Sequence, residues 1–521
     1  MTAPTTRRPP RPAADQPDRA VTTAVPHPSA VPAPTPGGTV APSDLPVTGH
    51  LVAGELIDGT GGDAVAVHDP SNGAVIGYAG LGDDALVARA VAAARAAQPG
   101  WAATPLRERM AYLDAWRGKL AAAADSLTEL VIDEMGLLPA FARNVHVGRA
   151  VACLERLEEL AEAVLAPRRE GISLIVREPA GLVAAITAWN FPLHMLVSKI
   201  SSAVALGNTV VLKPSEVKPL AAWAATRLLA ELDLPPGVVS VVGGTGPAVG
   251  AALVAHPDVD MISFTGSRAV GRRILAATAA TITRSVLELG GKNPALLLPD
   301  APLDTALPAV LGSCFFNNGQ VCGAQSRLIV PRALLGEVED RLVGLVADTA
   351  AGPPRAAGTR LGPVVSAVQR DRVAGYIRAG VDSGLRLLAG GPGAPDGLPD
   401  GSADGYYIRP TVFSDVPPDH QLAQEEIFGP VLTVHACDDV DEMVAVANGT
   451  RYGLTASVWS ADLDRSVAVA RRLQAGQVVV NGGGFNLSAP YGGVKESGNG
   501  REHGREGLAE LTEVKSMQLP A

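Results

Sequence analysis

Short apolar runs alternate with amphipathic stretches along the middle of this chain. Five of these runs are predicted to be buried strands, since each is short and bounded by Gly, Pro or Asn: Leu182–Ala188, Thr209–Leu212, Val238–Val242, Met261–Phe264 and Val286–Leu289. Helices are predicted between them, at Ala221–Leu232 and Ala248–Ala255. Strands that alternate with helices form βαβ units, so the pattern predicts an α/β fold with a parallel sheet covered on both faces.

Helical patterns also precede this block. They predict a helix over Ala85–Gln98 capped by Asp83 or Asp84, a second opened by Thr104-Pro105 as N-cap and first helical residue, a third from Asp125 to Gly136, and one long amphipathic helix over Asn144–Ala166. A second alternating block follows from Ala295 onward. It is interrupted by Gly390–Gly405, rich in Gly, Pro and Asp, which we interpret as a surface loop or hairpin.

Two alternating runs, Ile172–Arg177 and Glu513–Leu519, lie outside either block and are predicted to be strands. Isolated strands need a partner, and these two could pair across a subunit boundary. At 521 residues the chain is too long for a single core, which predicts two or three domains.

Composition narrows the class of partner. The chain is 47% hydrophobic and 18% charged, as in ordinary globular proteins, and its net charge of −10 argues against nucleic acid or an anionic membrane as the main partner. No apolar stretch approaches the roughly 20 residues that span a bilayer. The four cysteines lie far apart without metal-ligand spacing, which predicts free thiols, no metal site and a reducing, cytoplasmic compartment.

Residues 1–46 differ from the rest, because they are dominated by Pro, Ala and Thr and contain almost no large apolar side chains. Such a segment cannot bury enough surface to offset the entropy of ordering. We interpret it as a disordered extension, with a partner-binding tail as the alternative. Arg7-Arg8 could suggest a twin-arginine export signal, but no apolar region follows it.

Three separated stretches carry residues suited to chemistry at an aldehyde carbon. Phe315–Cys322 ends a small polar loop in a cysteine, Glu288–Lys292 places a carboxylate before a flexible Gly-Gly pair, and Trp189–Leu193 offers an amide beside a proline. A thiol nucleophile, a carboxylate base and an oxyanion donor are the three parts that acyl chemistry requires. Taken singly, Cys322 could be an inert buried thiol and Glu288 a surface carboxylate. The inert interpretation is preferred for the other cysteines, Cys153, Cys314 and Cys437.

Glycine-rich turns at strand ends suggest phosphate binding. Gly244–Gly250 follows a predicted strand but is one residue too long for the G-x-G-x-x-G fingerprint, and Gly266–Gly271 forms a second such turn. Both would place amide N–H groups at a helix start, where phosphate is favoured, although either could be an ordinary βα turn. Lys213-Pro214-Ser215-Glu216 follows another strand, and its Lys and Glu could hold two ribose hydroxyls. The alternative for Glu216 is a solvated carboxylate at a helix start.

These motifs together resemble those of the NAD(P)-dependent aldehyde dehydrogenases, in the family's order and with similar spacing, from about Leu51 to Pro520. The resemblance is carried by the oxyanion segment at Trp189–Pro192, the adenosine-ribose segment at Lys213–Glu216, the pyrophosphate turn at Phe264–Ser267, the general-base segment at Glu288–Lys292, the nucleophile loop at Gly319–Cys322, the nicotinamide-ribose segment at Glu425–Pro430, and the C-terminal signature at Pro490–Lys495 and Ser497–Glu502.

The resemblance implies a Rossmann-like cofactor domain, an α/β catalytic domain and a small β bridging element that mediates oligomerisation. We place the NAD-binding domain at 47–165 and 180–290, the catalytic domain at 291–496, and the bridging element at 166–179 and 507–521. A homodimer or homotetramer is implied, with a small-molecule aldehyde as substrate.

The resemblance also implies how the three chemical stretches act. A Cys322 thiolate attacks the aldehyde, and the side chain of Asn190 with the Cys322 backbone N–H holds the resulting oxyanion. Hydride then leaves to nicotinamide, and Glu288 activates the water that hydrolyses the thioester. A free thiol has a pKa near 8.5, so Cys322 needs local activation. Lys199 and Glu502 match positions that relay protons from the base.

Two other functions stay open. Family members that pass the acyl group to coenzyme A generally lack a glutamate at the base position, so Glu288 favours hydrolysis over a CoA-acylating enzyme. A structural or binding protein could keep the fold and the cofactor without turnover. The joint presence of Cys322, Glu288 and Asn190 argues against that alternative.

NAD is the implied cofactor, with NADP possible, because the Glu216 carboxylate repels a 2′-phosphate. The matched cofactor positions are Trp189, Lys213, Ser215, Glu216, Gly246, Phe264, Gly266, Ser267, Gly271, Leu289, Glu426 and Phe428.

The positions matched to the substrate tunnel are Phe191, His194, Met195, Ser198, Phe316, Phe485 and Tyr491. Their aromatic character suits an apolar aldehyde, while His194 and Ser198 allow a wider or more polar channel. His194 is interpreted as a packing residue and not as a proton carrier. No arginine stands among the matched positions to bind a carboxylate-bearing substrate, although loops could supply one.

Overall fold

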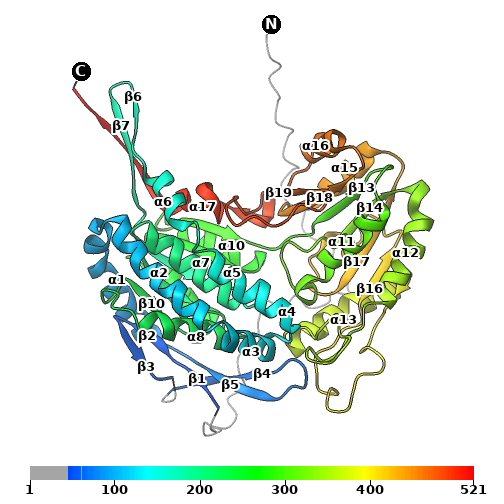
Figure 1. Cartoon of the computed structure of the whole chain (residues 1–521), viewed down its shortest axis with the longest axis horizontal. Coiled ribbons are helices and arrows are strands. Elements are labelled where there is room, and N and C mark those ends of the chain that lie inside the picture. Colours follow the sequence, from blue (N-terminus) through cyan, green and yellow to red (C-terminus); the bar gives the residue numbers. More distant parts are fainter. Residues whose placement is uncertain (1–44, 60–61, 521) are drawn as a thin grey trace. The chain divides into compact units, whose positions relative to one another are not determined.

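The computed structural model describes residues 45–59 and 62–520, so nearly all of the predicted N-terminal extension lies outside the described residues. Within the described part, the strands form two large and two small sheets (Figure 1). None of the helices in that part combines the length and the apolarity that crossing a membrane requires.

The first large sheet contains all five predicted strands, each within three residues of its predicted ends. Its order in the described chain is β20 (Gly498–Asn499), β12 (Arg284–Glu288), β11 (Met261–Thr265), β8 (Leu182–Ile186), β9 (Thr209–Lys213), β10 (Val239–Val241), β2 (His50–Val52) and β3 (Glu55–Ile57). The five central strands, β12 to β10, run parallel, as predicted, and antiparallel strands close both edges.

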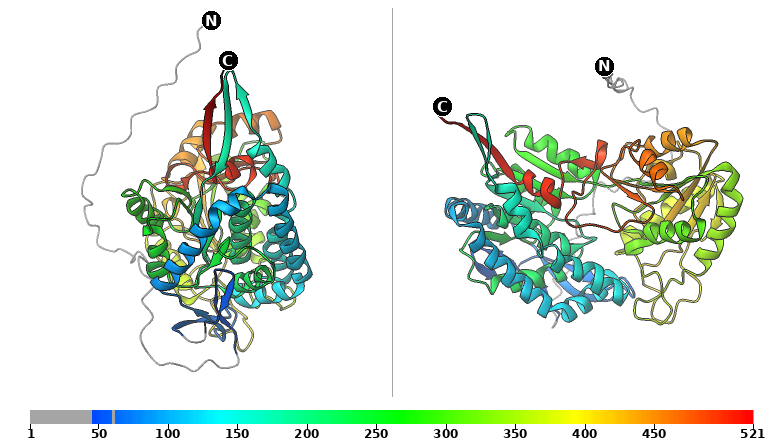
Figure 2. Two further views of the ribbon diagram at one scale, coloured as in Figure 1. Left: turned by 90° about the vertical axis from the view of Figure 1, so that its left-hand side faces the viewer. Right: turned by 45° about the horizontal axis from the view of Figure 1, so that its top comes forward.

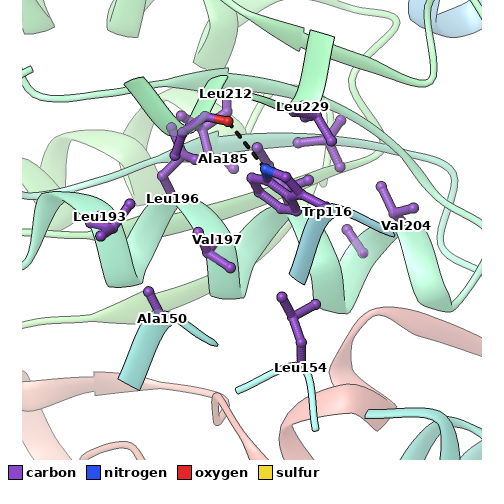
Figure 3. Packing of buried hydrophobic residues seen from close by; sticks show 14 of the residues in the cluster. Trp116, Ala150, Leu154, Ala185, Leu193, Leu196, Val197, Val204, Leu212 and Leu229 are labelled. Atoms are coloured by element: carbon purple, nitrogen blue, oxygen red, sulfur yellow. Dashed lines mark hydrogen bonds between the residues drawn. The ribbon is translucent and has the colours of Figure 1, made fainter. Parts of the chain in front are cut away.

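Helices cover both faces of this sheet, because successive strand residues enter two different cores. In β8, Leu182 and Ala184 join a core with α1 (Asp84–Ala103), whereas Val183 and Ala185 join a core with α7 (Pro192–Ala205). This alternation follows from the two-residue repeat of a strand. The second core also contains Trp116, whose Nε1 donates to the Ala225 carbonyl at 3.1 Å (Figure 3). Other helices of this half include α2 (Leu106–Ala122), α3 (Ala124–Met135), α8 (Leu220–Ala230), α9 (Ala251–Ala255) and α10 (Arg268–Thr278).

The second large sheet comes from the second alternating block. Its order is β15 (Arg386–Ala389), β16 (Thr411–Ser414), β17 (Val431–Cys437), β14 (Arg327–Pro331), β13 (Pro294–Leu297), β18 (Thr455–Trp459) and β19 (Gln477–Val480), parallel except between β15 and β16. Its helices are α11 (Leu303–Phe315), α12 (Leu335–Ala347), α13 (Ala367–Asp382), α14 (Gln421–Gln424), α15 (Val440–Asn448) and α16 (Leu463–Ala470). As predicted, Gly390–Gly405 contains no helix or strand.

The two stray strands pair with each other. β21 (Thr512–Gln518) runs antiparallel to β7 (Ser173–Pro179), and β6 (Arg168–Glu170) lies on the other side of β7 (Figure 2). The two strands thus pair with each other within one chain, and pairing across a subunit boundary stays a prediction. The other small sheet consists of β1 (Val47–Thr48), β5 (Val75–Gly80) and β4 (Ala64–His68).

The prediction of one long helix over Asn144–Ala166 was wrong. The chain forms α4 (Pro139–Phe141), a π-helical turn at Ala142–Val147, α5 (Gly148–Ala152), a bend, and α6 (Leu157–Leu165). A distant contact accompanies the π-turn, since the His146 ring lies 3.1 Å from Asn317 Oδ1. Such turns widen a helix and often occur at functional sites. Sequence periodicity does not reveal a contact of this kind.

Two helix starts also differ from prediction. Pro105, not Thr104, precedes α2, because the Thr104 hydroxyl donates to the Gly100 carbonyl and closes α1. The helix expected at Ala248–Ala255 begins with a π-turn at Gly246–Gly250, capped by Thr245.

Candidate active site

The loop that carries Cys322 begins where α11 ends. Asn317, Asn318 and Gly319 follow one another with positive φ angles of 53°, 57° and 77°. Asparagine and glycine tolerate this left-handed conformation best, which explains the Asn-Asn-Gly sequence. The buried Asn318 side chain fixes the turn, because its Nδ2 donates to the carbonyls of Gly136 and Pro363 at 3.2 and 2.8 Å.

Asn190 is joined to this loop by hydrogen bonds. Its Nδ2 donates to the Gln320 carbonyl at 3.0 Å, and Asn317 Nδ2 donates to the Asn190 carbonyl at 3.0 Å. An amide nitrogen carries two hydrogens, so Asn190 has one to offer a ligand after this bond. The predicted oxyanion donor and the nucleophile loop therefore lie together.

The Cys322 sulfur lies 3.2 Å from Tyr491 Oη. Burial raises the pKa of the Cys322 thiol to about 12, the carboxylates of Glu426 and Glu288 act in the same direction, and the Tyr491 hydrogen bond opposes them. The resting sulfur is thus a neutral thiol, and its activation requires a group that removes the proton.

Glu288 ends β12 at the edge where that strand meets Gly498. Both of its carboxylate oxygens are buried without a hydrogen-bond partner in the described chain. Burial and the nearby Glu502 carboxylate raise the pKa of Glu288 well above its usual value, against the opposing charges of Lys199 and Arg501. A buried carboxyl group with raised pKa and unsatisfied oxygens is suited to take a proton near neutral pH.

Lys199 and Glu502 form a buried ion pair, and Lys199 Nζ also donates to Ser263 Oγ at 2.8 Å. Burial opposes ionisation of Glu502, but Lys199 and His503 hold its pKa below the usual value. These residues line one pocket together with Arg501. Because their charges influence the pKa of Glu288, the predicted relay groups and the predicted base belong to one electrostatic cluster.

The predicted ribose residues lie at the carboxyl end of β9. Lys213 Nζ donates to Glu216 Oε2 at 2.9 Å, and the Gly246 backbone N–H donates to Glu216 Oε1 at 3.3 Å. Ser215 lies between them and is buried. The glycine-rich turn Gly244–Gly250 therefore contacts the Lys213–Glu216 pair. A Cβ placed on Gly246 would meet no other atom within 4 Å, so the turn is open there. This open turn beside the Lys–Glu pair has room for a nucleotide.

The second glycine-rich turn, Gly266–Gly271, packs closely against neighbouring side chains. A Cβ on Gly266 would lie 2.4 Å from the Phe264 ring, and one on Gly271 would lie 2.8 Å from the Leu289 side chain. Ser267 caps α10 by accepting from the Val270 N–H. These glycines are therefore required by packing, and the start of α10 is a position where backbone N–H groups favour an anion.

The nicotinamide-ribose candidates lie against the oxyanion segment. The Trp189 and Phe428 rings meet edge to face at 5.3 Å, and Glu426 Oε1 accepts from the Gly291 N–H at 3.1 Å. A Cβ on Gly291 would lie 2.7 Å from the Cys322 carbonyl oxygen, so the glycine that donates to Glu426 lies beside the nucleophile loop.

Most predicted substrate residues gather in one aromatic group. The Phe485 and Tyr491 rings lie 5.8 Å apart, Phe191 stacks on His146 at 4.6 Å, and His194 stacks on His503 at 5.5 Å. Phe485 is 41% exposed, so the group reaches the surface. Met195 and Ser198 follow on α7, where Met195 is half-buried and Ser198 Oγ donates to the Met195 carbonyl.

Sequence reasoning missed Arg149. Its guanidinium carbon lies 4.7 Å from the centre of the Phe485 ring and 5.5 Å from that of Phe316. The positions matched to the substrate tunnel contain no arginine, as expected. However, α5 brings Arg149 to the tunnel residues, and α5 lies in the segment that was predicted to be one long helix. Sequence spacing gave no signal for it, since Arg149 belongs to none of the quoted motifs.

Comparison with known proteins agrees with this geometry. The family model described as "Aldehyde dehydrogenase family" matches residues 56–517. A 3-succinoylsemialdehyde-pyridine dehydrogenase from Pseudomonas sp is 38% identical over 474 residues, which cover 89% of this chain and 97% of that protein.

Two solved structures are similar throughout. A mutant of aldehyde dehydrogenase C from Pseudomonas syringae, in complex with NAD+ and octanal, has 41% identity and a TM-score of 0.88, covering 91% of this chain and 97% of that one. An aldehyde dehydrogenase from Mycobacterium tuberculosis, in complex with NAD+, has 38% identity and a TM-score of 0.87, covering 91% and 99%. The chain therefore belongs to the aldehyde dehydrogenase family and is an NAD(P)-dependent oxidoreductase that oxidises an aldehyde.

Proposed function

We propose that this oxidation uses Cys322 as nucleophile, Asn190 as oxyanion donor and Glu288 as the base that hydrolyses the thioester. The observation that supports this assignment is the meeting of all three around one site: Asn190 shares the Gln320 carbonyl with the nucleophile loop, and the charge of Glu288 acts on the Cys322 thiol. Removing one oxyanion donor typically costs about 2.7–4 kcal/mol of transition-state stabilisation.

In the first step the Cys322 thiol gives its proton to a water molecule, and the sulfur bonds to the aldehyde carbon. Tyr491 Oη donates a hydrogen bond to the developing thiolate, which lowers the free energy of the charged form. The carbonyl oxygen becomes an oxyanion and accepts from Asn190 Nδ2 and the Cys322 N–H. When the oxyanion collapses, the hydrogen leaves the carbon with its electron pair, and a thioester on Cys322 results.

NAD is the proposed cofactor, and when bound it accepts that hydride. Lys213 and Glu216 would hold the adenosine ribose, the backbone around Gly246 and Ser267 the phosphates, and Glu426 the second ribose. Both structural relatives above were solved with NAD+. The Glu216 carboxylate disfavours the 2′-phosphate of NADP, so NADP is the weaker acceptor.

Hydrolysis completes the reaction. Glu288 takes a proton from water, the hydroxide attacks the thioester carbon, and the carboxylic acid leaves as the Cys322 sulfur departs. The Lys199–Glu502 pair then carries the proton away from Glu288 toward the pocket that it lines. A CoA-acylating enzyme would need water kept from the thioester, and a buried carboxyl base argues for the opposite.

The test is a panel of aldehydes with NAD and with NADP, followed by NADH or NADPH absorbance, with and without CoA. We expect NADH and free carboxylic acid, without a requirement for CoA. Formation of an acyl-CoA in place of the acid would support the CoA-acylating alternative. Tight NAD binding without oxidation of any aldehyde would support the non-catalytic one.

The proposed subunit has an NAD-binding domain at 47–165 and 180–290, a catalytic domain at 291–496 and a bridging element at 166–179 and 507–521. We propose that the bridging sheet joins subunits into a cytoplasmic homodimer or homotetramer. The turn between β6 and β7 exposes Ile172 at 54%, and β21 exposes Val514 at 57%, which favours the burial of these apolar side chains by another subunit. Light scattering of the wild type and of an Ile172→Lys, Val514→Lys variant tests this assembly, and cell fractionation tests the compartment.

A further inference from the structure

The aromatic group of the candidate tunnel surrounds an arginine without an acidic partner. The Arg149 guanidinium lies over the rings of Phe485 and Phe316, and the residue is half-buried. Among the residues that the structure describes, no carboxylate forms an ion pair with Arg149 and no protein group accepts a hydrogen bond from its guanidinium. A guanidinium has five N–H donors, so these donors are left for water or a ligand.

Nearby arginines differ in this respect. Arg143, on the preceding turn, pairs with Asp125, and Arg156, after the following bend, pairs with Glu159 at 2.7 Å. Both lie on the surface, where such pairs contribute little to stability. Arg149 is the more buried cation of the three, yet it is the one without a carboxylate. A partly desolvated cation without a counter-charge points to an anion that arrives from outside the chain.

Contacts lead from Arg149 to the reacting sulfur. The guanidinium carbon lies 4.7 Å from the Phe485 ring, that ring lies 5.8 Å from the ring of Tyr491, and Tyr491 Oη lies 3.2 Å from Cys322 Sγ. An aldehyde held at Cys322 and extended along these rings would bring its far end to Arg149.

The charges around Arg149 fit a single negative charge. His146, His194 and His503 lie near it, and for each of them burial is the main cause of a lowered pKa, so all three are neutral near pH 7. Arg149 is thus the one cation of this group. A carboxylate matches one guanidinium in charge and in its two-oxygen geometry, whereas a phosphate dianion would need more donors.

We propose that Arg149 binds a carboxylate at the end of the substrate opposite the aldehyde, so that the preferred substrates are ω-oxo carboxylic acids. This inference rests on the proposed oxidation at Cys322. Arg149 sets specificity and takes no part in bond making, since it acts on the far end of the molecule. The Phe485 and Phe316 rings hold the guanidinium plane and provide an apolar wall for the carbon chain between the two ends.

The test compares ω-oxo carboxylic acids of increasing length with unsubstituted aldehydes of equal length, on the full chain with saturating NAD. We expect wild type to prefer the acids, with an optimum at one length. Arg149→Met keeps the length of the stem without the charge, and kcat/KM for the best acid should fall by about 10- to 100-fold, mainly through KM. Arg149→Lys should restore part of this loss, because it keeps the charge.

The unsubstituted aldehydes supply the control. Their kcat/KM should stay within about 3-fold of wild type in Arg149→Met, which shows that the tunnel keeps its shape. An equal loss for acids and aldehydes, or a wild type that does not prefer acids, overturns the assignment of Arg149. Failure of both substrate sets in the wild type would instead refute the oxidation at Cys322, so the two failures are distinguishable.

Discussion

Two sides of the candidate site differ in the groups that surround their charged side chains. On the carboxylate side, which consists of Glu288, Lys199 and Glu502, opposite charges lie next to each other, and the Lys199–Glu502 pair is closed by a hydrogen bond to Ser263. On the aromatic side, which consists of Phe316, Phe485, Tyr491 and Arg149, the cation meets rings only. The carboxylate side is equipped to move protons, and the aromatic side to bind a substrate.

Among the residues that the structure describes, each side nevertheless has an ionisable group without a hydrogen-bond partner. These groups are the Glu288 carboxylate and the Arg149 guanidinium. The Glu288 oxygens are buried, and buried polar groups are nearly always satisfied in folded proteins, whereas Arg149 is half-buried and lacks an acidic partner among the described residues. In the proposed mechanism a water molecule hydrogen-bonds to the Glu288 carboxylate, and a substrate carboxylate accepts hydrogen bonds from the Arg149 guanidinium. Variants that act on one side and spare the other test this division.

The largest effect should come from the sulfur that both sides share. Cys322→Ala removes the nucleophile, and kcat should fall by about 10⁴-fold or more with every aldehyde. NADH absorbance measures the rate, and NAD binding by calorimetry should be unchanged. Turnover close to that of wild type would refute the assignment of Cys322.

Glu288→Gln removes the proposed base from the carboxylate side. Steady-state turnover should fall by about 10²- to 10⁴-fold, because no base is left to deprotonate the water that hydrolyses the thioester. The first turnover should remain, so rapid mixing should show a burst of NADH and mass spectrometry an acylated enzyme. Loss of the burst together with the steady rate would mean that Glu288 serves the first step.

Gly492→Ala should displace Glu288 without removing it. A Cβ at this position would lie 2.4 Å from Glu288 Oε1, and the glycine φ of 149° is unfavourable for alanine. We expect kcat to fall by about 10²-fold, since small displacements of catalytic groups have effects of this size. Gly484→Ala is the matched control, because a Cβ there meets nothing within 4 Å. Equal losses in the two variants would contradict the steric argument.

The relay pair should shift the pH profile in opposite directions. Glu288 acts as a carboxylate, so the rate of deacylation should rise with pH through its raised pKa. Lys199 lowers that pKa and Glu502 raises it. Lys199→Gln should therefore move the inflection to higher pH and Glu502→Gln to lower pH, each by about one unit. Shifts of the same sign in kcat profiles would contradict this arrangement.

The smallest effect is expected on the aromatic side. Tyr491→Phe removes the hydrogen bond to Cys322 Sγ, which is worth about 1 kcal/mol, so kcat/KM should fall by about 5-fold. The pH profile of thiol alkylation by iodoacetamide should move to higher pH, because the thiolate loses a donor. An unchanged alkylation profile would show that Tyr491 contributes shape alone.

The parallel strands could be predicted from the sequence, and the main chemical residues could be proposed from it, because both depend on local signals. The strands around Ala184 and Val211 are short apolar runs bounded by Gly, Pro or Asn. The Asn-Asn-Gly sequence before Cys322 indicates the left-handed backbone conformation that the turn adopts. The break in the helix over Asn144–Ala166 depends on the contact of His146 with Asn317, which lies far away in sequence. Arg149 was missed for the same reason, since its neighbours come from three other segments.

The Asn318-Gly319 step has a chemical consequence. In a flexible chain, asparagine before glycine is the pair most prone to deamidation, because the next backbone nitrogen can attack the side-chain amide. Here the turn is buried, and the Asn318 amide donates to two carbonyls, which holds it away from that attack. Ageing at this step should thus be slow in the folded enzyme and fast once heat opens the loop, which peptide mapping of heated and unheated samples would measure. A transient unfolding would then leave an aspartate or isoaspartate next to the nucleophile, and the damage would persist after the chain refolds.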